Sequence, residues 1–298
     1  MTRIPPPEGG TAAAALVRAA ASRLAAAGVP DPERDAEVLL AHVLGIDRGR
    51  LHARPERAVG EETVGRYDGL VRRRAAREPI QHLTGVQEFW SLPFRVTPDV
   101  LIPRPETEGI LEALLERALP AGPGRPRLLD LGTGSGCLAI AAAHALPAAQ
   151  VTAVDDSDAA LDVARGNART LGVADRVAFL SGDLFDALPR GPGAVPFDAV
   201  LSNPPYVAAA DLAGLAPEVR DHEPRRALTP GDDPLVVHRR ILAGAPRVLA
   251  AGGWLVVEFG AGQEAALRAL YAAQRAIRLE EIRPDLAGIP RVVVARAV

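Results

Sequence analysis

The spacing of apolar positions changes twice along the chain and divides it into three stretches. Between residues 11 and 78 the apolar side chains recur at helical spacing. The clearest run contains Ala36, Leu39, Leu40, Val43 and Leu44. Asp31-Pro32-Glu33 is typical of a helix start and Gly45 of a helix end, and Glu61 to Arg77 repeats the pattern. We therefore expect a small helical domain over residues 11–78.

The stretches on either side of this helical region have a different character. Residues 1–10 contain three consecutive prolines and predict a disordered leader. Across residues 79–102, aromatic positions such as Phe89 and Phe94 are interrupted by prolines, which favours short extended segments. We expect a linker there that contains a β-hairpin.

Residues 103–298 alternate between apolar runs of strand length and runs with helical spacing. The predicted strands are Arg127–Leu131, Gln150–Val154, Val177–Leu180, Asp198–Leu201, Trp254–Phe259 and Arg291–Ala295. The predicted helices are Cys137–Leu146, Ala159–Leu171, Leu235–Leu249 and Gln263–Gln274. This alternation predicts an α/β domain with a parallel sheet covered by helices on both faces.

Composition narrows the class of protein. Hydrophobic residues make up 48% of the chain and charged residues 24%, which is typical of a globular protein without a membrane span. The net charge of -3 gives no general attraction to phosphate backbones, so we expect no direct nucleic-acid substrate. The single cysteine, Cys137, excludes a disulfide framework, and the scattered histidines predict no metal site. We expect a cytoplasmic monomer, with Cys137 acting as a small buried hydrophobe.

A glycine-rich loop directly after the first predicted strand is the first candidate site. Its residues are Gly132, Thr133, Gly134, Ser135 and Gly136. Glycines let the backbone approach a ligand closely and leave helix N–H groups free to bind it. Asp155 ends the next strand, where an acid can accept hydrogen bonds from the hydroxyls of a ribose. The pattern predicts an adenosine-containing cofactor, and the segment taken alone also allows NAD.

Two further residues follow the third predicted strand, at the same sheet edge. Asp183 and Leu184 are placed to flank an adenine ring. An aspartate at a strand end can equally cap a turn.

The segment Asn203-Pro204-Pro205-Tyr206 follows the fourth predicted strand and should face the same crevice. Its prolines stiffen the backbone and leave carbonyl acceptors. The Asn203 side-chain carbonyl and the Pro204 backbone carbonyl could each accept one N–H of a planar amino or amide group, and Tyr206 could stack on it. Because both acceptors bind more strongly as positive charge develops on the nitrogen, the loop predicts nitrogen methylation.

The loop by itself fits an amide and an adenine equally. N(6)-adenine methylation of nucleic acid would need a basic face and contacts that flip a base, which the net charge disfavours. A cofactor-binding regulator has no use for such a loop, and an NAD-dependent oxidoreductase is the remaining alternative.

These motifs together resemble those of class I methyltransferases, and more narrowly those of bacterial peptide chain release factor N(5)-glutamine methyltransferases. The resemblance rests on Asp-Leu-Gly-x-Gly-x-Gly at residues 130–136, on Asn-Pro-Pro-Tyr at residues 203–206 and on Ile102-Pro103-Arg104-Pro105-Glu106-Thr107-Glu108. Further matches are residues 34–36, 78–85, 218–224 and 285–288. Glutamine methylation of a ribosomal protein is a close alternative.

The resemblance implies a Rossmann-like methyltransferase domain and an N-terminal domain that docks a release factor. S-adenosylmethionine would be the methyl donor and S-adenosylhomocysteine the product. The acceptor would be the glutamine of a Gly-Gly-Gln motif. By this likeness residues 132–136, Asp155, Asp183, Leu184 and Asn203 contact the cofactor, and residues 203–206 hold the glutamine.

The sequence also departs from the family pattern. Asp156 stands where the family commonly has an apolar residue, and Leu184 where an aromatic can flank the adenine. The basic run from Arg72 to Arg77 is interpreted as a solvated helix face, with a docking patch as the alternative.

Overall fold

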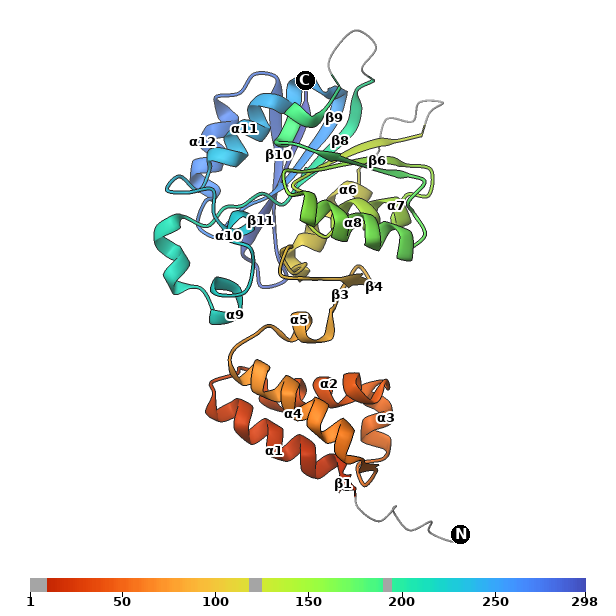
Figure 1. Cartoon of the computed structure of the whole chain (residues 1–298). Coiled ribbons are helices and arrows are strands. Elements are labelled where there is room, and N and C mark those ends of the chain that lie inside the picture. The colour runs from red at the N-terminus through yellow and green to blue at the C-terminus, as the bar shows by residue number, and fades with distance from the viewer. Residues whose placement is uncertain (1–9, 118–124, 190–194) are drawn as a thin grey trace. The chain divides into compact units, whose positions relative to one another are not determined.

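A computed structural model describes residues 10–117, 125–189 and 195–298. The chain forms two compact units (Figure 1). One runs up to Gly85 and includes Ala216–His222, and the other contains Val86–Leu215 and Glu223–Val298. Of the predicted leader only Gly10 is described, and most of the turn-rich stretch near residues 120–126 also lies outside the described residues.

The first unit is a small helical bundle. Its elements are β1 (Thr11–Ala12), α1 (Ala13–Ala26), α2 (Pro32–Leu44), α3 (Arg48–Ala53), β2 (Ala58–Val59), α4 (Glu61–Ala75), α5 (Ile80–Thr84) and α9 (Pro217–Arg220). Leu24, Leu39 and Leu40 are fully buried at its centre. Helix α2 begins with Pro32 in its first turn and ends at Gly45, whose φ of 64° is the left-handed conformation that glycine adopts readily.

The interpretation of Arg72–Arg77 as a solvated helix face was wrong at Arg74, whose side chain is buried. Its side chain is only 5% exposed and donates to Asp35 at 2.7 Å and to Glu218 at 2.9 Å. Arg77 pairs with the same glutamate at 2.6 Å. Burial raises the pKa of Glu218, but hydrogen bonds from Arg77 and Arg74 outweigh it and lower the pKa to about 2. Arg72 and Arg73, by contrast, are exposed as expected.

The second unit contains a seven-stranded sheet and a separate hairpin. The sheet strands are β5 (Arg127–Leu131), β6 (Gln150–Asp155), β7 (Val177–Ser181), β8 (Phe197–Ser202), β9 (Leu249–Glu258), β10 (Ile277–Pro284) and β11 (Pro290–Ala297), and the hairpin is β3 (Val86–Phe89) with β4 (Leu92–Arg95). The helices are α6 (Glu108–Leu115), α7 (Cys137–Ala145), α8 (Asp158–Thr170), α10 (Arg225–Leu228), α11 (Val236–Gly244) and α12 (Glu264–Ala272), with 3-10 turns η1 (Pro105–Thr107), η2 (Leu184–Ala187), η3 (Ala209–Gly214) and η4 (Ala245–Arg247).

The sheet order is β10-β11-β9-β8-β5-β6-β7. The expected parallel arrangement holds from β7 to β9, but β11 is antiparallel to both of its neighbours, β9 and β10. The prediction of an all-parallel sheet was therefore wrong at this edge. Strand β10 was not predicted, because its charged residues face solvent along the sheet edge and interrupt the apolar run.

Helices lie on both faces of the sheet (Figure 1), and a hydrophobic core packs between the sheet and the helices on each face. Alternate strand residues serve opposite faces, so Leu128 packs with α6 and α7 whereas Leu129 packs with α11 and α12. The hairpin contributes Phe89 and Phe94 to the first core, where both are buried. The expected α/β class is thus confirmed.

One helix is shorter than the sequence predicted. The expected helix Leu235–Leu249 ends at Gly244, where the chain continues as a 3-10 turn that contains Pro246. Strand β9 then begins at Leu249, five residues before the predicted start at Trp254. In the described parts of the chain, no helix combines the length and the apolar character needed to cross a membrane.

Candidate active site

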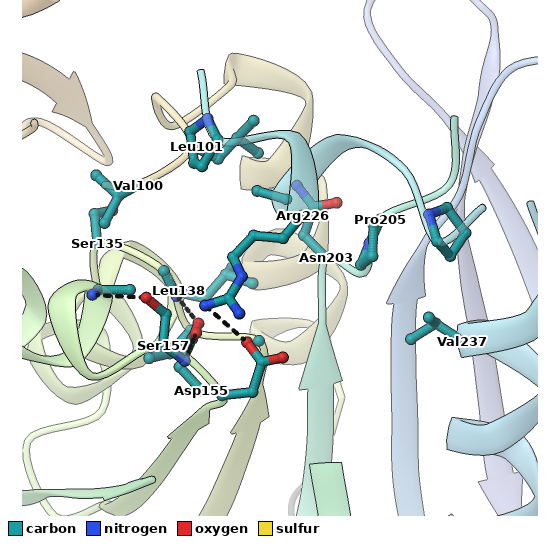
Figure 2. A pocket seen from close by; sticks show the side chains of 18 of the residues that line it. Val100, Leu101, Ser135, Leu138, Asp155, Ser157, Asn203, Pro205, Arg226 and Val237 are labelled. Atoms are coloured by element: carbon teal, nitrogen blue, oxygen red, sulfur yellow. Dashed lines mark hydrogen bonds and ion pairs between the residues drawn. The ribbon is translucent and has the colours of Figure 1, made fainter. Parts of the chain in front are cut away.

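A cavity of about 490 Å³ lies at the carboxyl ends of β5, β6, β7 and β8. Of the predicted site residues, those that line it are Gly132, Thr133, Gly134, Ser135, Asp155, Asp183, Leu184, Asn203 and Pro205. Figure 2 shows Ser135 and Asp155 on one side of this space and Asn203 on another. The glycine-rich loop and the Asn203 segment, which were expected to face the same crevice, therefore border a single cavity. Gly136, Pro204 and Tyr206 are not among its lining residues.

The loop between β5 and α7 presents backbone to the cavity. Gly132 and Gly134 have φ values of 73° and 55°, and a Cβ atom at either position would meet no heavy atom within 4 Å. Beneath the loop, the buried Asp130 carboxylate accepts a hydrogen bond from Thr133 Oγ1 at 2.6 Å. Burial raises the pKa of Asp130 to about 7. This buried bond fixes the loop while its glycines remain open to a ligand.

Gly136 is required for packing. Its φ is 83°, and a Cβ there would lie 2.9 Å from Ile140 Cδ1 and 3.1 Å from Ala164 Cβ. A side chain at this position would push α7 away from α8.

Asp155 ends β6 and links the loop between β5 and α7 to the start of α8. Its Oδ2 accepts from the Gly134 N–H at 2.8 Å and its Oδ1 from the Ser157 N–H at 2.9 Å. Burial raises the pKa of Asp155, although both backbone hydrogen bonds act in the opposite direction. Each carboxylate oxygen keeps a further lone pair with which to bind a hydroxyl.

Two of the other acids at the cavity lie beside arginines, whereas Asp99 accepts a hydrogen bond from Thr97 Oγ1. Asp183 forms an ion pair with Arg240 at 2.7 Å, and Asp156 lies 3.7 Å from Arg226. Leu184 has a φ of 50°, unusual for a leucine, and it packs against the second core from the cavity wall.

The segment after β8 is tied to η1 and β9. Asn203 Nδ2 donates to Thr107 Oγ1 at 3.0 Å, while no residue that the structure describes donates to Asn203 Oδ1. The Tyr206 hydroxyl donates to Glu258 Oε1 at 3.0 Å. Burial and the neighbouring Glu258 charge raise the pKa of Tyr206 well above its ordinary value, so its hydroxyl stays protonated.

Sequence reasoning assigned no role to Thr107 or Glu258, which contact the predicted asparagine and tyrosine. Thr107 lay within the quoted Ile102–Glu108 block, but without a stated function. Glu258 had a usable signal, because an acid inside the apolar run Trp254–Phe259 is unusual and buried acids need partners.

Cys137 and the other potential metal ligands show no catalytic arrangement. Burial raises the pKa of the Cys137 thiol to about 12, which keeps it protonated. Within the ranges that the structure covers, His, Cys, Asp and Glu side chains form no group of three or more that could hold a metal ion.

Comparison with known proteins identifies the family to which the chain belongs. Residues 15–85 match the model of the PrmC N-terminal domain, and residues 110–231 match the methyltransferase small domain. The chain is 45% identical to the release factor glutamine methyltransferase of Cereibacter sphaeroides over 95% of this chain and 98% of that one. It is 47% identical to that of Moorella thermoacetica over 93% and 95%. The chain belongs to the release factor glutamine methyltransferase family.

Membership in the release factor glutamine methyltransferase family confirms the resemblance drawn from the motifs. The fold also agrees with solved methyltransferases. The hMettl16 catalytic domain in complex with the MAT2A 3'UTR hairpin 6 superposes with a TM-score of 0.53 at 18% identity, covering 73% of this chain and 80% of that one. A methyltransferase from Pyrococcus furiosus gives a TM-score of 0.50 at 17% identity, covering 69% and 88%. These structures support the fold alone.

Proposed function

We propose that this chain transfers a methyl group from S-adenosylmethionine to the side-chain amide nitrogen of the glutamine in the Gly-Gly-Gln motif of peptide chain release factors. The observation that carries the proposal is that Asn203 lines the same cavity as Gly134 and Asp155. A group that can bind a planar amide and a loop that can bind a nucleoside therefore share one space. The names of the relatives in the family supply the substrate class.

The residues of the cavity fit S-adenosylmethionine. The open backbone at Gly132 and Gly134 leaves room for a close ligand, and Asp155 offers lone pairs to ribose hydroxyls. Leu138, Leu184 and other apolar side chains provide walls for an adenine ring. We assign to the cofactor the lining residues Gly132, Thr133, Gly134, Ser135, Asp155, Asp183, Leu184 and Asn203, together with Gly136, which ends the same loop without lining the cavity. When bound, S-adenosylmethionine supplies an electrophilic methyl group on a positively charged sulfur.

The segment at residues 203–206 has to orient a poor nucleophile. An amide nitrogen shares its lone pair with the neighbouring carbonyl, so it reacts only when it is held in line with the electrophile. Asn203 Oδ1 and the Pro204 carbonyl are proposed to accept the two N–H groups of the glutamine. Positive charge that develops on the nitrogen strengthens both hydrogen bonds, which lowers the barrier.

Tyr206 and Pro205 complete the proposed glutamine site. Pro205 lines the cavity, and the two prolines restrict the backbone to extended conformations. The Tyr206 hydroxyl is used by Glu258, so its contribution to the glutamine would come from the ring.

The two units are proposed to divide the work. Residues 11–78 would dock the release factor and residues 103–298 would carry out the transfer. Of the predicted linker 79–102, residues 79–85 belong to the first unit and residues 86–102 to the second. We further propose that the protein acts as a monomer in the cytoplasm, where release factors work, with the release factor as a protein substrate and no direct nucleic-acid substrate.

The decisive test measures transfer of labelled methyl groups to a purified release factor. A parallel reaction uses the same factor with the Gly-Gly-Gln glutamine replaced by alanine, and we expect label in the first reaction only. Equal labelling of both factors would refute the assignment of this glutamine as the methyl acceptor.

A variant tests the role of Asn203 in the same assay. Asn203→Ala should abolish turnover and leave the cofactor Kd, measured by calorimetry, within several-fold of wild type. Retained turnover would remove Asn203 from the proposed role.

A further inference from the structure

Glu258 is a buried carboxylate to which the proposed reaction assigns no part. It ends β9 at the same sheet edge as the cavity and is 1% exposed. Its Oε2 accepts from Thr107 Oγ1 at 2.7 Å, and its Oε1 accepts from the Tyr206 hydroxyl at 3.0 Å. One carboxylate thus contacts both the 3-10 turn η1 and the segment after β8.

The bonding of Thr107 determines which way the Asn203 amide faces. A threonine hydroxyl carries one hydrogen, and here it is donated to Glu258. The Thr107 oxygen can therefore only accept from Asn203, and the amide atom that can donate is Nδ2. A flipped amide would set Asn203 Oδ1 against an oxygen whose only hydrogen is already used, at the cost of an unmade buried hydrogen bond.

We propose that Glu258, acting through Thr107, is a positioning residue that fixes the orientation of the Asn203 side-chain amide. The consequence rests on the proposed function. With Nδ2 held by Thr107, Asn203 Oδ1 is left to accept an N–H of the substrate amide. In the flipped orientation an N–H of Asn203 would face an N–H of the substrate, and the site would repel the group that it has to bind.

The negative charge on Glu258 fixes the direction of the hydrogen bonds that it makes with Thr107 and Tyr206. An ionised carboxylate only accepts, so both Thr107 and Tyr206 must donate to it. The charged groups that act on Glu258 are Arg291, which favours ionisation, and Glu106, which opposes it. Burial raises the pKa of Glu258 to about 6, and the hydrogen bonds from Thr107 and Tyr206 limit that rise, so the carboxylate is ionised at neutral pH.

The far end of the segment is held to the chain after β9 as well. The Tyr206 carbonyl accepts from Gln263 Nε2 at 2.9 Å, and Gln263 Oε1 accepts from the Gly260 N–H at 3.0 Å. Because these bonds do not involve Thr107, removal of its hydroxyl should release the Asn203 amide and leave the backbone of the segment in place.

The test compares three variants of the full chain in the methyl-transfer assay, with Glu112→Gln, at an exposed position on α6, as a control. Thr107→Val keeps the side-chain volume but removes the hydroxyl, and Thr107→Ser restores it. Glu258→Gln offers one acceptor and one donor instead of two acceptors. We expect kcat to fall by roughly 10²-fold in Thr107→Val and Glu258→Gln, as when one positioned hydrogen-bonding group is lost from an active site.

The expected pattern separates positioning from a purely structural effect. Thr107→Ser should recover most of the wild-type kcat, Glu112→Gln should keep it, and the cofactor Kd should stay unchanged in all variants. Wild-type kcat in Thr107→Val, no recovery in Thr107→Ser, or a loss confined to KM or to the cofactor Kd would each overturn the proposal. If Thr107→Val fails to fold, the same criteria are applied to Glu258→Gln.

A second measurement needs no turnover and so separates this proposal from the proposed function. In ¹⁵N-labelled protein, the Asn203 side-chain NH₂ resonances are identified by their loss in Asn203→Asp. They should shift or broaden in Thr107→Val and return towards the wild-type position in Thr107→Ser. Unchanged resonances would refute the positioning role, whereas absent methyl transfer by the wild-type chain would refute only the proposed function.

Discussion

Replacing Arg74 by methionine should destabilise the helical unit far more than the same change at Arg72. Both arginines lie on α4 and both form ion pairs, Arg74 with Asp35 and Arg72 with Asp68. The side chains of the first pair are 5% and 8% exposed, whereas Arg72 is 66% exposed. Only the first change leaves a charge without a partner and without water.

The magnitude follows from that burial. Breaking a buried ion pair from one side costs about 3–5 kcal/mol, because the remaining charge is left uncompensated. Asp35 lies in the first turn of α2, where the helix dipole still stabilises its negative charge by about 0.3–1 kcal/mol after Arg74 is removed. Glu218 keeps its bonds to Arg77. We therefore expect the free energy of unfolding to fall by about 3 kcal/mol in Arg74→Met, against about 0–1 kcal/mol for an exposed pair in Arg72→Met.

Amide hydrogen exchange on the full chain resolves this effect by unit. About 3 kcal/mol corresponds to roughly a 10²-fold loss of protection in α2 and α4. Amides of β5 serve as an internal reference, and Arg74→Met/Asp35→Leu should recover part of the loss because both charges are then absent. Equal protection in Arg74→Met and Arg72→Met would refute the reasoning from burial.

Two further predictions concern the methyltransferase unit. Gly136→Ala should lower its free energy of unfolding by about 2–3 kcal/mol, because the left-handed φ and a contact of 2.9 Å with Ile140 both disfavour a side chain there. The control Gly172→Ala, at a φ of 73° but with open space around it, should lower the free energy of unfolding in urea by only about 1 kcal/mol. Equal losses in the two variants would contradict the packing argument. Burial against Tyr271 lowers the pKa of His238 to about 4, so the unfolded chain takes up a proton before the folded chain does as the pH falls. Relative to His238→Gln, the free energy of unfolding of the wild type should therefore fall by about 3 kcal/mol between about pH 6.5 and pH 4. Parallel curves of stability against pH would rule this out.

The strands that build the cavity could be predicted because their apolar runs are local features. Arg127–Leu131 was predicted to the residue, and the loops that follow the parallel strands had to share one sheet edge. Asn203 and Asp155 were therefore brought together by topology alone. Strand β10 escaped prediction because an edge strand exposes one face and its register shifts near Leu279.

Contacts between distant parts of the chain could not be predicted in the same way. Arg74 sits in a run of charges that looks like a helix surface, and its partner Glu218 is 144 residues away. Thr107 and Asn203 are 96 residues apart, and nothing local marks them as partners. Such pairs depend on how the elements pack, which the spacing of apolar residues does not specify.

The reversed strand β11 has a consequence for the order in which the sheet can form during synthesis. Strand β10 is synthesised before β11, but it lies at the edge of the sheet and pairs with β11 alone among the described strands. Strand β11 is made last of the seven and lies between β10 and β9. A nascent chain that has reached Pro284 thus holds a strand with no place in the sheet, and β9 has one open edge. Only when residues 290–297 have been added can both edges be paired, so growing chains that stall before this point expose an unpaired strand edge to other chains.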